Sequence, residues 1–323
     1  MRILLTHSPE ARALYYGPRA LARLGQLGEV KLHEGPVPLE GDALIAAAGD
    51  CDLIVSYRQS AAPAAFFERL PKLIAFLRCA IDIRNIDVAA ASKAGVLVTQ
   101  ASAGFVSAVA EMVLGFLVDL SRGITHAAID YRAGRVPKAR MGGELKGSTL
   151  GVIGYGAIGK EVVRIGRALG MRVLVHDPYQ PVEQAPLDEL LGQSHYVVPL
   201  AVATPETENL IDAAAFAKMK PGAYLINVSR GNLVDERALE AALDSGRLAG
   251  CAMDVGRAPD QMPTPRLAAR TDVIATPHTA GLTLAAIEHQ SLETVAQAGD
   301  IVKGRVPKGA VNAEHWSRRL GEL

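Results

Sequence analysis

The sequence predicts an α/β protein with two Rossmann-like domains, each built on a doubly wound parallel sheet, and a cleft between them. Three observations lead to this prediction. Short apolar runs that read as strands alternate with helix-like runs along almost the whole chain, and repeated strand–helix units form mainly parallel sheets. One long helical stretch interrupts the alternation, which then begins again. The length of 323 residues also suits two domains of roughly 100–200 residues each.

Residues 1–100 hold the first series of alternating segments. The expected strands are Arg2–His7, Glu29–His33, Leu53–Ser56, Lys72–Leu77 and Val96–Thr99. The expected helices are Pro18–Leu27, Leu44–Gly49, Ala64–Leu70 and Ile86–Ala94. This order predicts a parallel sheet with crossover helices.

The second series follows a long helix expected at Ser107–Arg122, a further helical stretch to about Gly134, and a turn at Leu145–Ser148. Its expected strands are Thr149–Gly154, Arg172–His176, Tyr196–Ala201, Tyr224–Val228, Cys251–Val255 and Val273–Thr276. Its expected helices are Ile158–Leu169, Leu187–Leu191, Ala213–Met219 and Glu236–Ser245. Such a series fits a doubly wound nucleotide-binding domain. The remaining C-terminal residues, with one helix at about Leu284–Val302, are too few for a third domain and are expected to pack on the first.

Composition excludes several classes of protein. The chain balances 34 basic against 34 acidic residues, whereas a nucleic-acid binder needs a basic face. Its three cysteines are too scattered for a disulfide framework or a metal site. The N-terminal apolar run Ile3–Leu5 is too short for a signal peptide, and acidic residues interrupt the apolar stretch Val106–Leu120. We therefore expect a cytoplasmic protein that binds neither nucleic acid nor a membrane.

The strongest local motif is the glycine-rich run Gly154-Tyr155-Gly156-Ala157-Ile158-Gly159. It follows an apolar strand and opens a helix, which is the context of a dinucleotide-binding loop. Gly154 permits the tight turn, Gly156 lets the backbone approach a pyrophosphate, and Gly159 allows close packing of helix on strand. Ala157 and Ile158 lie at the helix N-terminus, where free amides favour an anion. The alternative is a purely structural turn.

The next expected strand ends at His176, and Asp177 follows it. A carboxylate at this point accepts hydrogen bonds from the ribose hydroxyls of a dinucleotide. It would also repel the 2′-phosphate of NADP, so NAD is the expected cofactor. Asp177-Pro178 is at the same time a turn-forming pair, and the two roles are compatible.

Polar residues follow three further strands of this second series: Arg230, Asp254 and His278. Because ligands of open α/β sheets bind outside the carboxyl ends of the strands, we expect these side chains to face one crevice. Each residue alone is commonly structural. Together, around a dinucleotide site, an arginine, an acid and a histidine suit hydride transfer.

Further motifs resemble the D-isomer-specific 2-hydroxyacid dehydrogenase family. In order they are Asn85–Asp87, Val109–Glu111, Thr204–Thr207, Met219–Ala223, Asn227–Gly231, Leu233–Glu236, Ala252–Val255 and Thr276–Gly281. The likeness covers essentially the whole chain. It implies a discontinuous, flavodoxin-like substrate-binding domain of residues 1–100 and 283–323, and an NAD-binding Rossmann domain of residues 101–282. It also implies a homodimer, with the helix from Ser107 at the interface.

The resemblance implies that the chain interconverts a 2-oxo acid and a D-2-hydroxy acid with NAD. Arg230 would hold the substrate carboxylate and polarise the C2 carbonyl. His278 would be the general acid in reduction and the general base in oxidation. Other residues would line the cofactor cleft, with Asp254 at the nicotinamide end: Pro178, Thr207, Val228, Ser229, Asp254 and Gly281.

The first departure from the family pattern concerns the partner of His278. The family has a glutamate followed by a proline shortly after the strand-end aspartate, and Pro259 occupies the glutamate position here. Asp260 is the first candidate to replace the glutamate, and its carboxylate would stabilise the imidazolium. Gln261 is the second candidate and would only orient the ring. A plain polar loop is the remaining alternative.

The second departure lies in the loop after the fourth expected strand, where the family has glycines whose amides bind the substrate carboxylate. Ala80 and Asp82 stand there, on either side of Ile81, and these three residues and Arg58 are the expected substrate-binding residues. An acidic group beside an anion site weakens binding unless it is paired. Either Arg84 or Arg58 therefore neutralises Asp82, or Asp82 selects a substrate with a cationic or hydroxylated group.

Two other functions stay open. The altered loops favour an NAD(H)-binding regulatory protein with little or no turnover, similar to the transcriptional corepressors that share this fold. The presence of Arg230 and His278 favours an enzyme. Formate dehydrogenases combine an arginine and a histidine with a glutamine, but the short N-terminal lobe speaks against that function.

Overall fold

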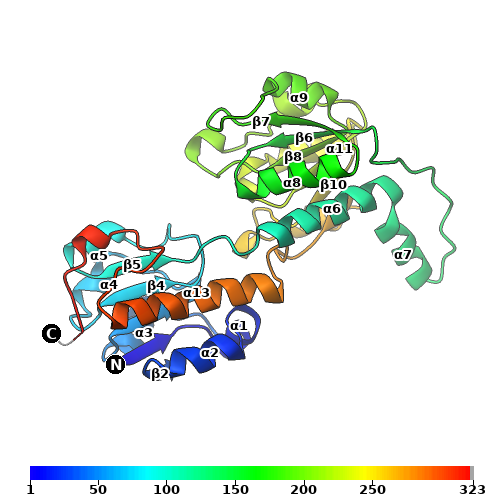
Figure 1. The fold of residues 1–323 in the computed structure, drawn as a ribbon. Helices are drawn as coiled ribbons and strands as arrows, with labels where there is room; N and C mark the ends of the chain where they lie inside the picture. Colours follow the sequence, from blue (N-terminus) through cyan, green and yellow to red (C-terminus); the bar gives the residue numbers. More distant parts are fainter. Residues whose placement is uncertain (321–323) are drawn as a thin grey trace. The chain divides into compact units, whose positions relative to one another are not determined.

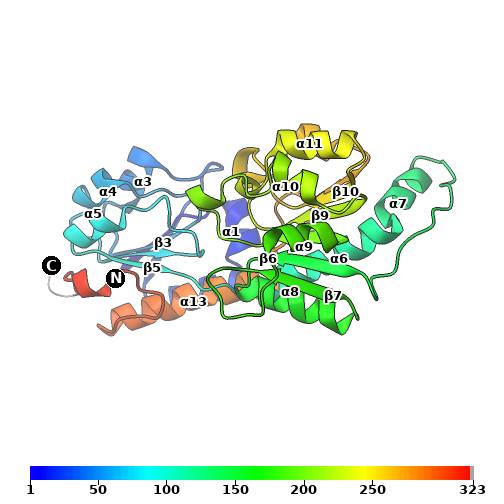
Figure 2. The same cartoon turned by 90° about the horizontal axis from the view of Figure 1, so that it is seen from above.

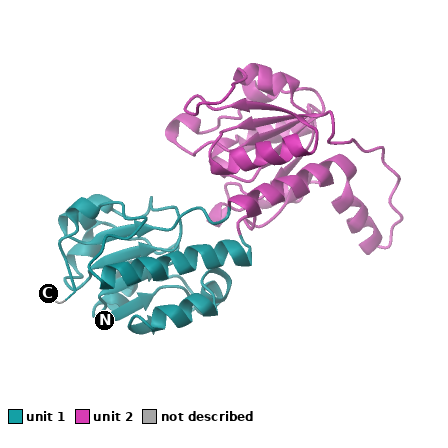
Figure 3. Cartoon of the chain, in the orientation of Figure 1, with its two compact units in different colours: residues 1–105, 282–323 teal, residues 106–281 magenta. Residues whose placement is uncertain are grey.

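The chain folds into two compact units, and the computed structural model describes residues 1–320. Unit 1 comprises Met1–Phe105 and the segment that begins at Leu282, and unit 2 comprises Val106–Gly281 (Figure 3). The first boundary lies at residue 105 rather than at the expected residue 100. The reason is that the chain beyond residue 100 remains bound to unit 1, where the Ser102 N–H donates to Glu293 Oε2 at 2.7 Å.

Unit 1 is built on a parallel sheet of five strands in the order β2-β1-β3-β4-β5. The strands are β1 (Arg2–Leu5), β2 (Glu29–Leu32), β3 (Leu53–Ser56), β4 (Ala75–Arg78) and β5 (Leu97–Gln100). The helices are α1 (Pro9–Tyr15), α2 (Pro18–Gly25), α3 (Gly41–Ala48), α4 (Ala64–Glu68), α5 (Val88–Lys93) and α13 (Leu284–Val302) (Figure 1).

Helices cover both faces of the unit 1 sheet. Figure 2 shows α3, α4 and α5 on one side and α13 on the other. On the first face Leu44 and Phe66 pack on strand residues such as Phe76. On the second face Leu24 of α2 and Ile301 of α13 share a core. The C-terminal helix therefore completes unit 1, as the sequence predicted.

Unit 2 is built on a parallel sheet of six strands in the order β11-β10-β9-β8-β6-β7. The strands are β6 (Thr149–Ile153), β7 (Arg172–His176), β8 (Tyr196–Pro199), β9 (Ala223–Asn227), β10 (Leu248–Met253) and β11 (Val273–Ala275). The helices are α6 (Val106–Arg122), α7 (Ile124–Arg132), α8 (Ala157–Ala168), α9 (Leu187–Gln193), α10 (Ala213–Lys218), α11 (Glu236–Asp244) and α12 (Pro265–Ala268). Two parallel sheets with crossover helices confirm the predicted fold class.

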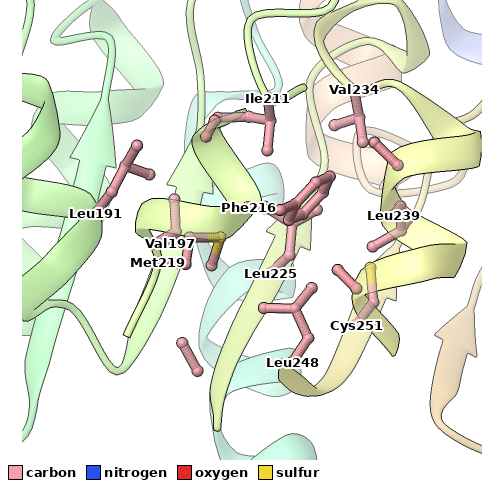
Figure 4. Packing of buried hydrophobic residues seen from close by; sticks show 14 of the residues in the cluster. Leu191, Val197, Ile211, Phe216, Met219, Leu225, Val234, Leu239, Leu248 and Cys251 are labelled. Atoms are coloured by element: carbon pink, nitrogen blue, oxygen red, sulfur yellow. The ribbon is translucent and has the colours of Figure 1, made fainter. Parts of the chain in front are cut away.

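The core of unit 2 lies between the sheet and helices α9, α10 and α11. Figure 4 shows Phe216 of α10 among Leu225 of β9 and Leu239 of α11. Helices α6 and α8 pack together on the other face of the sheet. Strand β6 lies between β7 and β8, so the chain changes direction across the sheet at β6. The carboxyl ends of β6 and β8 form the position where doubly wound sheets bind ligands.

Helices α6 and α7 are separated by Gly123, which has the left-handed φ of +67°. The two helices are bent by 70° relative to each other, so α7 points away from the unit 2 sheet, and an extended segment leads from α7 back to β6 (Figure 1). Among the described residues, no single helix has the length and apolar character needed to cross a membrane, and α6 with α7 meets that test only as this bent pair.

The structure differs from the expected elements at several ends. Helix α1 was not predicted, although Ser8 and Pro9 mark its start: the Ser8 hydroxyl accepts from Ala11 N–H at 3.3 Å. Strand β4 begins at Ala75 rather than Lys72, because Leu73 is still part of a turn in which its N–H donates to Leu70 O. Helix α5 begins after Asp87, whose carboxylate caps it at Ala90 N–H. Capping residues, rather than apolar periodicity, set these boundaries.

Candidate active site at the carboxyl edge of the unit 2 sheet

The glycine loop after β6 has the geometry of a phosphate-binding turn. Gly154 has a φ of +104°, and a Cβ there would lie 2.6 Å from the carbonyl carbon of Leu200. A Cβ at Gly159 would lie 2.1 Å from Gly154 O, so helix α8 packs directly on the turn. No atom lies within 4 Å of a Cβ position at Gly156. The N-terminus of α8 at Ala157 and Ile158 therefore has an approachable backbone, which fits a pyrophosphate.

Asp177 follows β7 and lies against this loop. Its Oδ2 accepts from Tyr155 N–H at 2.7 Å, and its Oδ1 accepts from Tyr179 N–H at 2.9 Å. Each carboxylate oxygen can accept a further hydrogen bond, so these contacts hold the group in place for ribose hydroxyls. Pro178 lies exposed in the turn between. The donor and acceptor set of this edge fits a dinucleotide.

The turn after β9 carries Arg230, and Asn227 shapes it. The Asn227 side chain is buried; it donates from Nδ2 to Arg230 O at 3.0 Å and accepts at Oδ1 from Ser229 N–H at 3.1 Å. The Arg230 guanidinium donates to Ser229 O at 2.8 Å. A Cβ at Gly231 would lie 2.1 Å from Gly256 O, so the turns after β9 and β10 touch through their main chains. Sequence reasoning did not give Asn227 a role, although a buried amide at a strand end is a signal for one.

Asp254 is completely buried, and its carboxylate binds the loop that carries His278. Oδ1 accepts from Thr276 Oγ1 at 2.5 Å and Thr279 N–H at 2.8 Å, and Oδ2 accepts from Ala280 N–H at 2.8 Å. The main chain adds a bond from His278 N–H to Asp254 O at 3.0 Å. The structure therefore gives Asp254 a positioning role, and its expected contact with the nicotinamide stays a prediction.

The partner of the His278 ring differs from the expected one. His278 Nδ1 lies 2.7 Å from the main-chain carbonyl oxygen of Asp260. The structure thus shows a main-chain contact of residue 260 with the ring, and the expected catalytic role of the Asp260 carboxylate stays a prediction. Gln261 Oε1 is buried without a hydrogen-bond partner among residues 1–320, so the amide oxygen of Gln261 does not accept from the ring. The signal was missed because a main-chain carbonyl is present at every position of a sequence.

Several residues in and around the His278 loop have a left-handed backbone conformation. Asp260, Gln261 and His278 have φ values of +56°, +58° and +55°, and Asn209 is the other non-glycine residue with positive φ within the described part of the chain. Such conformations are costly for residues with a Cβ and cluster at functional sites. We therefore place the candidate active site at this pair of loops.

The remaining residues expected around the cofactor have simpler surroundings. The Thr207 hydroxyl donates to Val202 O at 2.6 Å and accepts from Thr204 N–H at 2.8 Å, so it caps a short 3-10 helix. Val228 is buried directly after β9, and Ser229 Oγ donates to Ala201 O at 3.4 Å. Gly281 is the last residue of unit 2. The contacts of all four with a cofactor stay predictions.

The residues expected to bind substrate lie in unit 1, at the carboxyl ends of β3 and β4. The fully buried Arg78 donates to the carbonyl oxygens of Tyr57 and Ser60 and to Asn85 Oδ1. Asn85 Nδ2 in turn donates to Arg58 O at 3.1 Å. Arg78 and Asn85 thus tie together the two loops that carry these residues, a role that sequence reasoning missed.

Asp82 has a bidentate pair with Arg84: Nε lies 2.9 Å from Oδ1, and Nη2 lies 2.5 Å from Oδ2. This pair fits the expectation that an arginine neutralises Asp82, with Arg84 as that arginine. Ala80 is half-buried beside it and Ile81 is exposed. The guanidinium carbon of Arg58 lies 5.2 Å from the centroid of the Tyr15 ring, within unit 1.

His7 lies in unit 1 between the rings of Tyr16 and Tyr57, at centroid distances of 5.2 and 5.1 Å. It is fully buried, and neither ring nitrogen has a hydrogen-bond partner among the described residues. Burial, aided by the charges of Arg78 and Arg12, lowers the pKa of His7 to about 3. His7 is therefore neutral at physiological pH.

No group of three or more His, Cys, Asp or Glu side chains in the described chain has an arrangement that could hold a metal ion. The glycine loop, the Arg230 guanidinium and the His278 imidazole lie in turns that follow strands of the same sheet.

Comparison with known proteins gives a consistent result. Residues 114–280 match the model of the "D-isomer specific 2-hydroxyacid dehydrogenase, NAD binding domain". The D-3-phosphoglycerate dehydrogenase of Methanocaldococcus jannaschii is 31% identical over 94% of this chain and 59% of its own length. That of Mycobacterium bovis is 33% identical over 95% and 61%. The chain thus spans about 60% of the length of these relatives.

Two solved structures are similar to this chain over both of its units. The apo-structure of D-lactate dehydrogenase from Escherichia coli superimposes with a TM-score of 0.82 at 26% identity, covering 96% of this chain and 100% of the other. The TT0316 protein from Thermus thermophilus gives a TM-score of 0.86 at 28% identity, covering 96% and 100%.

Proposed function

The chain belongs to the family of D-isomer specific 2-hydroxyacid dehydrogenases, and from this membership we propose that it is an enzyme that interconverts a 2-oxo acid and a D-2-hydroxy acid with NAD(H). The observation that carries the proposal is the fixed ring of His278, which Asp254 and Asp260 hold at the same sheet edge as the glycine loop. A left-handed conformation at a residue with a Cβ is a mark of a functional site, and a histidine held there can exchange a proton with a bound substrate.

In the proposed mechanism the nicotinamide, when bound, supplies or accepts the hydride at C2 of the substrate. Arg230 binds the substrate carboxylate with its planar guanidinium and stabilises the negative charge that grows on the C2 oxygen during reduction. His278 donates a proton from Nε2 to that oxygen, and in oxidation it accepts the proton. Asp254 keeps the His278 loop in place throughout.

The cofactor preference follows from Asp177. Two main-chain amides hold its carboxylate beside the glycine loop, where it accepts from the ribose of NAD and repels a 2′-phosphate. On the substrate side we propose that Ala80, Ile81 and Arg58 contact the 2-oxo acid. The pair with Arg84 keeps the charge of Asp82 away from the substrate carboxylate.

The proposal is tested by NADH oxidation against a panel of 2-oxo acids: glyoxylate, hydroxypyruvate, pyruvate, phenylpyruvate and cationic or bulky analogues, with NADPH in parallel. We expect turnover with NADH. Arg230→Ala should lower kcat by about 10²–10³-fold, because a group that stabilises the oxyanion is lost, while the Kd for NADH, measured by fluorescence, changes little. NADH binding without turnover of any panel member would favour the regulatory function instead. Equal losses of kcat and NADH affinity in Arg230→Ala would show that Arg230 serves the cofactor or the fold.

We further propose that the partner of this chain is a second copy. Helix α7 has no buried residue. Exposed apolar side chains lie along it and the segment that follows: Ile124, Ile129, Tyr131, Val136 and Met141. Apolar groups gathered on one projecting arm are typical of an interface, and symmetric dimers are the commonest oligomers. The proposal includes no nucleic-acid or membrane partner.

We place the protein in the cytoplasm. Cys51, Cys79 and Cys251 are buried free thiols, and burial raises the pKa of the Cys51 thiol to about 11. Protonated, buried thiols suit a reducing compartment.

A further inference from the structure

The ring of His278 has an unusual acceptor for a general acid. Nδ1 lies 2.7 Å from the main-chain carbonyl oxygen of Asp260. A carbonyl oxygen accepts and never donates, so this hydrogen bond requires a proton on Nδ1 in both the neutral and the charged ring. The proton that the ring exchanges must therefore be the one on Nε2, because Nε2 is the ring nitrogen that remains available to a substrate.

The carbonyl is aimed at the ring by the turn after β10. Gly256 N–H donates to Gln261 O at 2.8 Å, and Ala258 N–H donates to Met262 O at 3.0 Å, which closes the turn. Within it Asp260 and Gln261 both have left-handed φ values, +56° and +58°. Aspartate tolerates this conformation better than most residues with a Cβ. The residue type at position 260 thus matters for the direction of its main chain.

We propose that the main-chain carbonyl of Asp260 is the positioning group of His278, and that the left-handed backbone at residue 260 takes over the work of an orienting carboxylate. This inference rests on the proposed function, in which His278 transfers the proton. A carbonyl is a neutral dipole, so it fixes the ring and its tautomer without adding a full negative charge beside the imidazolium. The ionisable side chains of the turn after β10 are Asp254, Arg257 and Asp260. The elements in contact with this turn add Arg230, on the turn that touches it through Gly231, and Glu236, whose carboxylate accepts from Arg257 N–H.

Two substitutions at position 260 separate the carbonyl from the carboxylate. Asp260→Asn removes the charge and keeps a residue that accepts the left-handed conformation. Asp260→Val also removes the charge, but a β-branched residue strongly disfavours a φ of +56°. We expect kcat to be about 10–100-fold lower in Asp260→Val than in Asp260→Asn, the usual effect of losing an orienting group. We also expect the midpoint of the kcat–pH profile to differ by less than about half a pH unit between Asp260→Asn and wild type, because removing a contacting carboxylate shifts such a midpoint by about 1–3 units.

Gly246→Val is the matched control, because Gly246 has a left-handed φ of +68° after α11 in unit 2, and nothing there lies within 4 Å of a Cβ position. Backbone strain alone would lower kcat in Gly246→Val as it does in Asp260→Val. We expect the loss in Gly246→Val to be at least about tenfold smaller. Equal losses in Asp260→Val and Asp260→Asn, or a large shift of the pH midpoint in Asp260→Asn, would overturn the proposal in favour of the carboxylate.

A second measurement reads the wild-type protein and needs no turnover; a variant serves only to assign the signals. Two-bond ¹⁵N–¹H correlation spectra report which ring nitrogen of a neutral histidine carries the proton, and the His278 signals are assigned by their loss in His278→Asn. We expect the Nδ1-protonated tautomer. The Nε2-protonated tautomer would overturn the proposal. Because this readout is independent of catalysis, inactivity toward every 2-oxo acid would refute the proposed function and leave this test standing.

Discussion

At the scale of single residues, two buried polar side chains hold the loops of the site in place. Asp254 uses both carboxylate oxygens on the His278 loop, and Asn227 uses both ends of its amide on the Arg230 turn. Buried polar groups that are fully hydrogen-bonded fix one conformation, and leaving one of them unpaired is costly. The two side chains that would touch substrate are therefore held by two that would not.

Because Asp254 holds the loop that carries His278, the effect of the Asp254→Asn substitution can be predicted. Asparagine replaces one carboxylate oxygen by an NH₂ group, which then faces a donor: Thr279 N–H or Ala280 N–H. A buried donor left without an acceptor costs about 1–3 kcal/mol, and the loop that carries His278 loses its fixed position. We expect kcat to fall by about 10–100-fold while NADH affinity, measured by fluorescence titration, is nearly retained.

Thr276→Val is the milder companion variant, because it removes one hydroxyl donor and leaves both amide bonds to Asp254 in place. Its loss of kcat should be several-fold smaller. A strong loss of NADH affinity in Asp254→Asn, with kcat preserved at saturating cofactor, would instead support the contact with the nicotinamide that the sequence predicted.

The sequence predicted the residues whose roles depend on their spacing along the chain. It did not predict the residue whose role depends on the direction of its main-chain carbonyl. Gly154 and Gly159 are needed because a Cβ would collide with backbone, and that requirement is visible as a fixed interval in the sequence. The acceptor of His278 Nδ1 is a carbonyl, which every residue has. Only the φ of +56° at Asp260 directs it to the ring, and no side-chain pattern encodes that angle.

At the scale of elements, the alternation of strands and helices was predictable because buried parallel strands and amphipathic crossover helices have distinct periods. Element ends were less so. Helix α1 and the start of α5 depend on the single caps Ser8 and Asp87, which apolar periodicity does not register.

The arm formed by α7 and the following segment carries the element-scale prediction. Ile129 is 53% exposed on a helix with no buried residue. If the arm binds a second copy, Ile129→Asp places a charge in an apolar interface, and we expect the dimer to be weakened by about 2–4 kcal/mol. Sedimentation velocity over a range of concentrations measures this change.

Val306→Asp is the control for added charge, because Val306 is 54% exposed and lies in unit 1. It should sediment as wild type does. A wild-type chain that sediments as a monomer at all concentrations, or an Ile129→Asp variant with an unchanged dimer constant, would refute the proposed interface.

At the scale of the whole molecule, each unit has its own sheet and its own core, so each is expected to unfold with its own pH dependence. The chain contains natural probes with which the unfolding of unit 1 can be followed. Trp316 is the only tryptophan of the chain and is buried in the core of unit 1. His7 lies in unit 1, whereas His195, whose pKa is lowered by burial and by Lys220, lies in unit 2. Tryptophan fluorescence therefore follows the unit that contains His7.

The pKa of His7 falls from 6.5 to about 3 on folding, which sets the sign of the effect. Below about pH 6.5 the unfolded chain binds a proton at His7 that folded unit 1 does not. The free energy of unfolding is therefore complete above that pH and falls by about 1.4 kcal/mol per pH unit as the pH decreases toward 3. At pH 5 we expect a loss of about 2 kcal/mol. Carboxylates stay largely ionised there, so their contribution is small.

Urea titrations followed by Trp316 fluorescence at pH 7 and pH 5 measure this loss. His7→Phe keeps a ring between Tyr16 and Tyr57 without a titrating group, so we expect most of the difference between the two pH values to vanish. In His315→Gln, which removes an imidazole whose side chain is 58% exposed, the difference should persist. If His7→Phe retained the full pH dependence, other groups would have to titrate on unfolding, and a buried neutral His7 would not be the acid-sensitive point of unit 1.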